Sequence, residues 1–415
     1  MSSAAPNEIA EGSSTGDWWF RLSVLTMSHA VGSLGMMSVL AVAPLIQRDL
    51  ALTATQFGLL VAVYGGSQVL GSPLAGQIAD RLGVGRTLAL AMVIFTVSIL
   101  VVSQAHVLTG ALIGVAGLGI GYAFINPATA RGIMEWAPPS QRATGMGIKQ
   151  TGVPMGGILG AGAALLASLI DWRMTLVCVA GLSLLAVAPC LSLSRLDRPR
   201  SGPARSFLST WPSLLTNRNL VVLSLATAGL NMCQASFFGF LTLFAKDSIG
   251  FSAVTAGLCL GVSQTAAACG RVLWGVVGDR LFGRRRKILY VYVAALASTL
   301  LAVFALVQPG WLVFLLVMVT LLGLTVGSYA AIVQTMVVES VAPHDAGAAS
   351  GYFLCVISLG NMSGPLLFGA IVDQSQSYAA GWVLLAVIGA VSTAAIMIGF
   401  SDRRQWREHS VASPN

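Results

Sequence analysis

Long apolar segments alternate with short polar turns along the whole chain. Each segment holds about 20 residues or more with few charges, the length that a helix needs to cross the roughly 30 Å hydrocarbon core of a bilayer. The strand-like alternation of an outer-membrane barrel does not occur. The pattern therefore predicts an all-α membrane protein. We expect twelve transmembrane helices at residues 20–47, 54–78, 87–106, 108–136, 143–170, 174–193, 219–245, 252–277, 288–307, 311–341, 346–371 and 379–400.

The longest polar gap, residues 194–217, contains several arginines together with Pro199, Pro203 and Pro212. This composition is typical of a linker. We therefore expect two six-helix bundles at 20–193 and 219–400. A basic linker at 194–218 would join them, and tails at 1–19 and 401–415 would flank them.

The composition supports a membrane location. Hydrophobic residues make up 56% of the 415 residues and charged residues only 9%, which is too little polar surface to cover a soluble globule of this size. In a soluble protein the net charge of +8 would suggest a nucleic-acid partner. Here the placement of the basic residues indicates topology, so we expect a lipid bilayer as the surroundings and no nucleic acid.

Lysine and arginine orient the chain, because cytoplasmic loops carry an excess of both. With a cytoplasmic amino terminus, seventeen fall in cytoplasmic segments, and only Arg48, Arg173 and Lys246 fall outside. We therefore expect both termini in the cytoplasm and a multi-pass protein of a bacterial-type inner membrane.

The two halves echo each other. Gly76 and Asp80 recur as Gly275 and Asp279, at an offset of 199, and further matches such as Glu135 with Glu339 follow at an offset of 204. Ancient duplication explains this pattern. Parallel repeats of this kind are related by an axis along the membrane normal.

Twelve helices in two halves, with Gly-x-x-x-Asp-Arg-x-Gly followed by a basic residue after helix 2 and again after helix 8, resemble the major facilitator superfamily. The copies depart from the motif where Val84 and Gly85 precede Arg86 and where Phe282 is inserted. The resemblance implies secondary transport. No G-x-x-x-x-G-K-[ST] segment for ATP is present, and we expect no cofactor, no metal and no enzymatic activity.

In this family the motif suggests a cytoplasmic latch. Asp80 and Asp279 would lie near the facing amino ends of helices from the other half, which stabilise a carboxylate by roughly 0.3–1 kcal/mol. The alternative is a solvated basic turn that only anchors orientation. The candidate latch residues are Gly76, Asp80, Arg81, Gly83, Arg86, Arg131, Glu135, Gly275, Asp279, Arg280 and Gly283.

Three cations lie within the expected helices: Arg131, Lys149 and Arg271. A cation at the bilayer centre costs at least about 2.5 kcal/mol, so each is expected to face a partner or a cavity and to serve a function. No Asp or Glu lies in the middle of any expected helix. Uncompensated positive charge is what an anion site needs.

Arg271 shares a small, polar helix face with Gly261, Gln264 and Gly275. Its guanidinium can hold a carboxylate through two parallel hydrogen bonds. Its position four residues before Gly275 is similar to the helix 8 arginine of monocarboxylate transporters and oxalate/formate antiporters in this superfamily. Ala267 stands where the monocarboxylate carriers have an acidic residue, so their proton scheme does not transfer directly.

Lys149 lies on a stripe with Gly145, Gly152, Gly156 and Gly160, where glycines allow close helix packing. It therefore points into the protein and contacts substrate or a gate, unless it snorkels to the nearby cytoplasmic end. Arg131 is four residues before Glu135, the spacing that supports an ion pair.

Neutral polar residues away from the loops complete a candidate cavity. Histidine is the one side chain among them whose unperturbed pKa suits proton shuttling, although a packed neutral histidine is the alternative. Some of the others can simply bridge helices. The candidates are His29, Tyr64, Gln68, Tyr122, Asn126, Asn231, Gln234, Tyr329 and Asn361.

These features favour a monomeric secondary transporter of a small organic anion, a carboxylate, working by proton symport or anion exchange. The run from Asn126 to Pro154 resembles the anion/cation symporter branch. Export of drugs is the alternative, because Gly152 to Gly157 loosely approximates the drug/proton antiporter signature. A membrane sensor that binds without translocating is a third reading, of another class.

Overall fold

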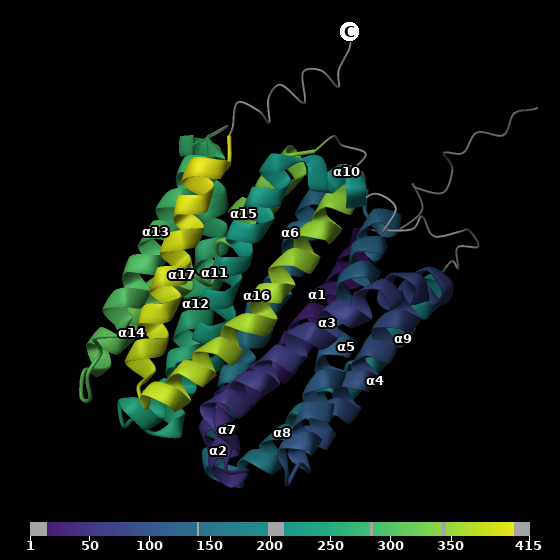
Figure 1. Cartoon of the computed structure of the whole chain (residues 1–415). Helices are drawn as coiled ribbons and strands as arrows, with labels where there is room; N and C mark the ends of the chain where they lie inside the picture. Colours follow the sequence, from purple (N-terminus) through teal and green to yellow (C-terminus); the bar gives the residue numbers. More distant parts are fainter. Residues whose placement is uncertain (1–14, 139–140, 198–210, 283–284, 342–345, 402–415) are drawn as a thin grey trace, which may run out of the picture.

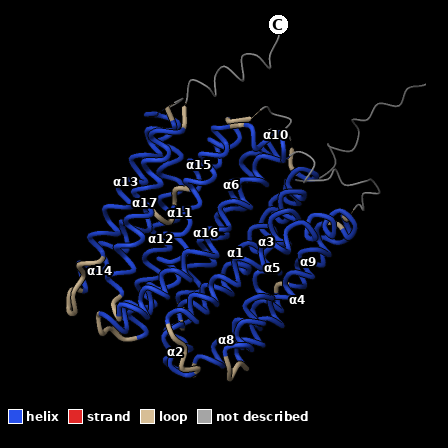
Figure 2. Tube along the Cα trace, in the orientation of Figure 1, coloured by secondary structure: helices blue, strands red, loops and turns tan. Residues whose placement is uncertain are grey.

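The structure is a computed structural model that describes residues 15–138, 141–197, 211–282, 285–341 and 346–401. Within these ranges the ordered elements are all helical, and none is a strand (Figure 2). The first half forms α1 (Thr15–Ala41), α2 (Ala43–Asp49), α3 (Ala54–Leu82), α4 (Val84–Ser103), α5 (Leu108–Trp136), α6 (Arg142–Ala161), α7 (Ala163–Ile170), α8 (Trp172–Leu185) and α9 (Val187–Ser192). The second half forms α10 (Trp211–Thr216), α11 (Arg218–Leu243), α12 (Ala253–Val277), α13 (Arg286–Phe304), α14 (Leu312–Thr325), α15 (Ala330–Glu339), α16 (Ala346–Ser375) and α17 (Tyr378–Gly399).

The predicted helices are found, but several are divided. The segments expected to be continuous at 20–47, 143–170, 174–193 and 311–341 are each split in two, and the first helix begins at Thr15 instead of residue 20. The break between α14 and α15 lies where the chain packs tightly on α12. A Cβ at Gly327 would lie 2.7 Å from the Ala267 Cβ on that helix.

Ten of the described helices are long and apolar enough to cross a membrane, or eleven when the bent helix α3 is counted as one span. The bend of 52° falls between Ser72 and Leu74, where a proline in the sequence supplies no backbone N–H to the helix ladder. α14 is apolar but shorter than a span on its own. The chain is therefore a multi-pass membrane protein, and the count of twelve spans stays a prediction.

The glycine stripe predicted on α6 packs against α1. A Cβ at Gly152 would clash with the backbone oxygen of Thr26, and one at Gly156 with that of Ala30. The two helices can approach this closely only because these positions carry no side chain. This contact confirms that the glycine face of α6 points into protein.

The two halves meet along two helix pairs, α3 with α16 and α6 with α12 (Figure 1). We call the end where α3, α5 and α12 finish the basic end, and the end where α2 and α7 lie the opposite end; these are the upper and lower ends in Figure 1. Contacts between the halves lie toward the opposite end. There Gly58 packs on Pro365, Gly257 on Ala164, and Thr242 Oγ1 donates to the Leu40 oxygen at 2.6 Å.

Candidate functional site

Arg131 on α5 is the one predicted intramembrane cation with carboxylate partners among the described residues. Its Nε lies 2.8 Å from Glu135 Oε1, and its Nη1 lies 3.5 Å from Asp80 Oδ1 and also donates to the Ala79 oxygen. The predicted pair with Glu135 is thus confirmed. Because Asp80 is on α3, the cluster joins two helices of the first half.

Lys149 on α6 is buried, with 2% of its surface exposed. Its Nζ donates to Thr129 Oγ1 on α5 at 3.1 Å, and within the described ranges no carboxylate lies within ion-pair distance of it. The prediction that Lys149 points into protein is confirmed. Snorkelling to the basic end is wrong, because the glycine face seats this side chain between α1 and α5.

His29 on α1 completes this network. Its side chain is fully buried, and its Nε2 lies 3.0 Å from the same Thr129 hydroxyl. Thr129 was not among the predicted site residues, although it lies three residues after Asn126 on the face that also carries Tyr122. That helical spacing is the signal that could have found it.

Arg271 on α12 is half-buried, and its Nε is shielded from solvent without a hydrogen-bond partner in the described part of the chain. Tyr122 from the first half and Tyr329 from its own half lie near it. The described residues provide no carboxylate partner for it. Arg271 therefore lies at the boundary between the halves, and no carboxylate of the described residues compensates its charge.

Lys149 and Arg271 lie at nearly the same depth. The antiparallel helices α6 and α12 touch where Gly157 packs against Gln264. Lys149 is eight residues from Gly157 toward the basic end, and Arg271 is seven residues from Gln264 in the same direction. At 1.5 Å per residue, the two cations differ in depth by only about 1.5 Å.

Tyr122 on α5 is the centre of the predicted aromatic group. Its ring stands edge-on to His29 and tilted toward Tyr64, with both centroid distances 6.4 Å. Gln68 lies beside Tyr64, and Asn126, one turn after Tyr122, is exposed. The structure thus brings together the predicted residues of the first half.

The polar residues predicted in the second half act mainly as bridges between helices. Asn231 accepts from the Tyr329 hydroxyl at 3.0 Å and donates to the Ile357 oxygen at 2.7 Å, while Gln234 donates to the Val326 oxygen at 2.8 Å. Asn361 on α16 is half-buried and lies against Gly65 of α3. Of this group, Tyr329 is the one linked to Arg271.

The predicted latch residues at the basic end make their described contacts within their own halves. Asp80 contacts Arg131, and Gly83, at φ 89°, makes the turn into α4. The start of α4 is capped by Asp197, which accepts from the Gly85 and Arg86 amides at 2.8 and 3.1 Å. The Arg81, Arg86 and Arg280 side chains are exposed. Gly283 and the side chain of Asp279 lie outside the described residues.

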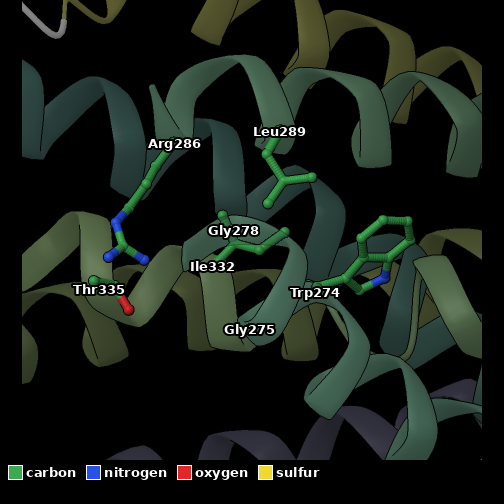
Figure 3. Close-up of a pocket in the computed structure, with 7 residues that line it drawn as sticks. All are labelled: Trp274, Gly275, Gly278, Arg286, Leu289, Ile332 and Thr335. Carbon is green, nitrogen blue, oxygen red and sulfur yellow. The ribbon is translucent and has the colours of Figure 1, made fainter. Parts of the chain in front are cut away.

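Two small pockets lie at positions that the internal repeat relates. One is lined by Gly76, Ala79, Asp80, Pro127, Arg131, Met134 and Glu135. The other, shown in Figure 3, is lined by Trp274, Gly275, Gly278, Arg286, Leu289, Ile332 and Thr335. Thr335 corresponds to Arg131, so the guanidinium that meets Glu339, at 3.2 Å, comes from Arg286 on α13 instead. The duplicated scaffold keeps an ion pair at both places with a different source of the cation.

A second cluster, which the sequence did not reveal, joins the halves at the opposite end. Asp373, near the end of α16, accepts from the amides of Ala54 and Thr55 at 2.9 and 2.8 Å and from the Thr55 hydroxyl. These amides are the unpaired donors at the start of α3. A carboxylate of one half thus caps a helix of the other.

Comparison with known proteins identifies a family and several relatives that this chain resembles. The sequence model described as "Major Facilitator Superfamily" matches residues 25–320 and 265–414. The quinolone resistance protein NorA of Staphylococcus aureus is 25% identical over 343 residues, which is 82% of this chain and 87% of that protein. The hexuronate transporter of Bacillus subtilis is 22% identical over 396 residues, 90% of this chain and 92% of that protein.

Solved structures share the fold. A bacterial homologue of the human lysosomal transporter Spinster, in an inward-facing and unoccupied conformation, superposes with a TM-score of 0.79 at 17% identity, covering 95% of this chain and 99% of that one. The nucleoside transporter NupG gives 0.76 at 15% identity, covering 92% and 100%.

Proposed function

The chain belongs to the major facilitator superfamily, and we propose that within this family of transporters it carries a small organic anion, a carboxylate, across the inner membrane by alternating access. Both termini would lie in the cytoplasm, so the basic end would be the cytoplasmic one. The bundles at 20–193 and 219–400 would rock around a site near mid-membrane.

The observation that carries this proposal is that the three intramembrane cations differ in their carboxylate partners. Arg131 has two carboxylates beside it, whereas neither Lys149 nor Arg271 has one among the described residues. Positive charge inside a membrane is costly unless something compensates it. An anionic substrate supplies that compensation at Arg271.

The position of Arg271 suits a substrate that moves between two halves. Its guanidinium belongs to α12, and the nearby Tyr122 belongs to α5. A carboxylate held by two guanidinium N–H groups can accept a further hydrogen bond from the phenol hydroxyl. Binding would therefore engage both halves and favour the transition between their two arrangements.

The contacts between the halves support an arrangement in which the opposite end is closed. Asp373 and the glycine contacts join the halves at the opposite end, while Asp80 at the basic end contacts its own half. During alternating access the opposite end would open and the basic end would close. Gly76 and Gly275 would then be free to approach other helices, since nothing lies within 4 Å of a Cβ built at either position.

Export of hydrophobic compounds is the second candidate function, favoured by the similarity to NorA over 82% of the chain. The hexuronate transporter favours the anion proposal, because a hexuronate is a sugar carboxylate. The two candidates differ in their dependence on Arg271, which an exported hydrophobic cation does not need.

A thermal-shift screen of the purified protein tests the choice. The ligands are lactate, succinate, benzoate, glucuronate, phosphate and the cationic dye ethidium, with glucose as the uncharged match for glucuronate. The anion proposal expects stabilisation by one or more carboxylates and not by glucose. Stabilisation by ethidium alone contradicts it and supports drug export.

A further inference from the structure

Thr129 determines how the buried His29 ring is protonated. The single hydroxyl proton of Thr129 is donated to the Ile125 oxygen at 2.7 Å, and Lys149 Nζ donates to the hydroxyl oxygen at 3.1 Å. With the hydroxyl proton directed to the helix carbonyls, at 2.7 Å to Ile125 and 3.2 Å to Asn126, the contact of 3.0 Å to His29 Nε2 is donated by the imidazole. His29 thus carries a proton on Nε2.

The other ring nitrogen has nothing to bind. His29 Nδ1 is buried and has no hydrogen-bond partner in the described part of the protein. In a neutral ring with the proton on Nε2, Nδ1 holds an acceptor lone pair. An unsatisfied acceptor on a fully buried side chain requires an explanation, and the simplest ligand for it is a proton.

The charged surroundings of His29 are positive. Lys149 on α6 is the charge that acts directly on the ring, and Tyr122 on α5 stands at its edge. Arg271 on α12 acts on Tyr122 in turn. From α9, Cys190 contacts the adjacent Ser28. In the described ranges, no ionisable side chain of α4, α8 or α11 bonds to His29. A positive charge on the ring, beside that of Lys149, is therefore unfavourable while no anion is bound.

We propose that His29 binds the coupling proton of anion transport at Nδ1. A proton taken from water forms an N–H bond with the Nδ1 lone pair, and the ring becomes an imidazolium. When the anion leaves, that bond breaks and water takes the proton back. The inference rests on the proposed function, and it selects proton symport over anion exchange.

The coupling follows from the charges that are already in place. With the site empty, burial of the ring opposes a charge on it, and the like charge of Lys149 opposes it further. An anion at Arg271 and Tyr122 offsets the positive field, so the ring can accept its proton. By linkage, the proton strengthens anion binding by the same factor as the anion strengthens proton binding. Lys149 acts here as a positioning residue for charge and needs no contact with substrate.

Proton uptake on binding is the direct test. The purified full-length protein, in weakly buffered detergent solution at pH 7 with a pH indicator, is mixed in turn with lactate, succinate, benzoate and glucuronate, while calorimetry measures the amount bound. About one proton per bound anion is expected for the wild-type protein. His29→Gln keeps an N–H donor for Thr129 but cannot bind the proton, and about a tenfold lower ratio is expected.

His106→Gln is the matched control, because His106 is exposed at the opposite end of the bundle. It is expected to keep the wild-type ratio. The wild-type protein provides a test that needs no variant. Where one proton is taken up with each anion, the affinity for the anion falls about tenfold for each unit by which the pH rises.

Each outcome decides a different claim. Anion binding without proton uptake overturns the inference about His29 and leaves anion transport intact. Unchanged uptake in folded His29→Gln protein moves the proton site elsewhere, and pH-independent wild-type affinity overturns the inference even if that variant does not fold. If none of the four carboxylates binds, the proposed function itself fails.

Discussion

Asp373 and Thr55 are 318 positions apart in the sequence, yet the Asp373 carboxylate accepts hydrogen bonds from both the amide and the hydroxyl of Thr55. They belong to α16 and α3, the antiparallel helix pair along which the two halves meet. Asp80 lies near the other end of α3 and was predicted to lie near the amino ends of helices from the other half. One helix pair thus carries a carboxylate suited to each end of the transporter.

Asp373→Asn is expected to loosen the opposite end. It removes the charge and one of the two acceptor oxygens, a loss of about 2 kcal/mol and therefore roughly thirtyfold in the population of the closed arrangement. Spin labels at Arg48 and Gln374, in a background without native cysteines, are expected to report a longer distance. Asp49→Asn is the control, because Asp49 pairs with Arg173 of its own half. Equal distances in all three proteins would show that the Asp373 contact does not hold the end closed.

Asp80→Asn is expected to act in the opposite sense. If Asp80 holds the basic end together in the other arrangement, its loss disfavours that arrangement and slows transport by about tenfold. Spin labels at Arg86 and Leu281 are expected to shift to longer distances. Restored activity in the Asp80→Asn, Asp373→Asn double variant would support a balance between the two ends. Full activity of Asp80→Asn alone would reduce this motif to an orientation signal.

Arg131→Gln is expected to weaken the fold more than it weakens recognition. The change leaves Glu135 and Asp80 without their buried cation, which destabilises the protein by about 3 kcal/mol. The melting temperature in detergent checks this value. The Arg271→Gln protein, whose arginine has no carboxylate partner in the described ranges, is expected to melt close to the wild type. The reverse order of stabilities would contradict the division of these cations into structural and functional ones.

Gly156→Ala is expected to destabilise the contact between α1 and α6. The added Cβ would collide with the Ala30 backbone, and overpacking of this kind costs about 1–3 kcal/mol. Gly181→Ala is the matched control, since nothing lies within 4 Å of that position and alanine favours a helix. Equal melting temperatures for the two variants would mean that the helices are not packed this tightly in the protein.

Local spacing accounts for what the sequence predicted correctly. The pair of Arg131 with Glu135 and the glycine face that seats Lys149 both follow from helical periodicity, which fixes neighbours within one turn. Tyr122 and His29 were identified because polar side chains are rare in apolar helices. These inferences need no knowledge of the tertiary arrangement.

The remaining contacts depend on how distant helices approach each other. The cap by Asp373 and the hub at Thr129 involve partners that are 20 to 319 positions apart, and no local pattern relates them. The helix break near Gly327 likewise lies against a distant helix, α12. The helix carbonyls that Asn231 and Gln234 contact could not be predicted for the same reason.

Uptake of labelled carboxylate by proteoliposomes tests the central claim most directly. The carboxylate that stabilises the purified protein best is used with wild-type, Arg271→Gln and Lys246→Gln proteins, the last serving as a cation control at the opposite end. We predict saturable uptake by the wild-type and Lys246→Gln proteins and at least about a tenfold loss in Arg271→Gln. Equal uptake by folded Arg271→Gln protein would contradict the assignment of Arg271 as the anion site.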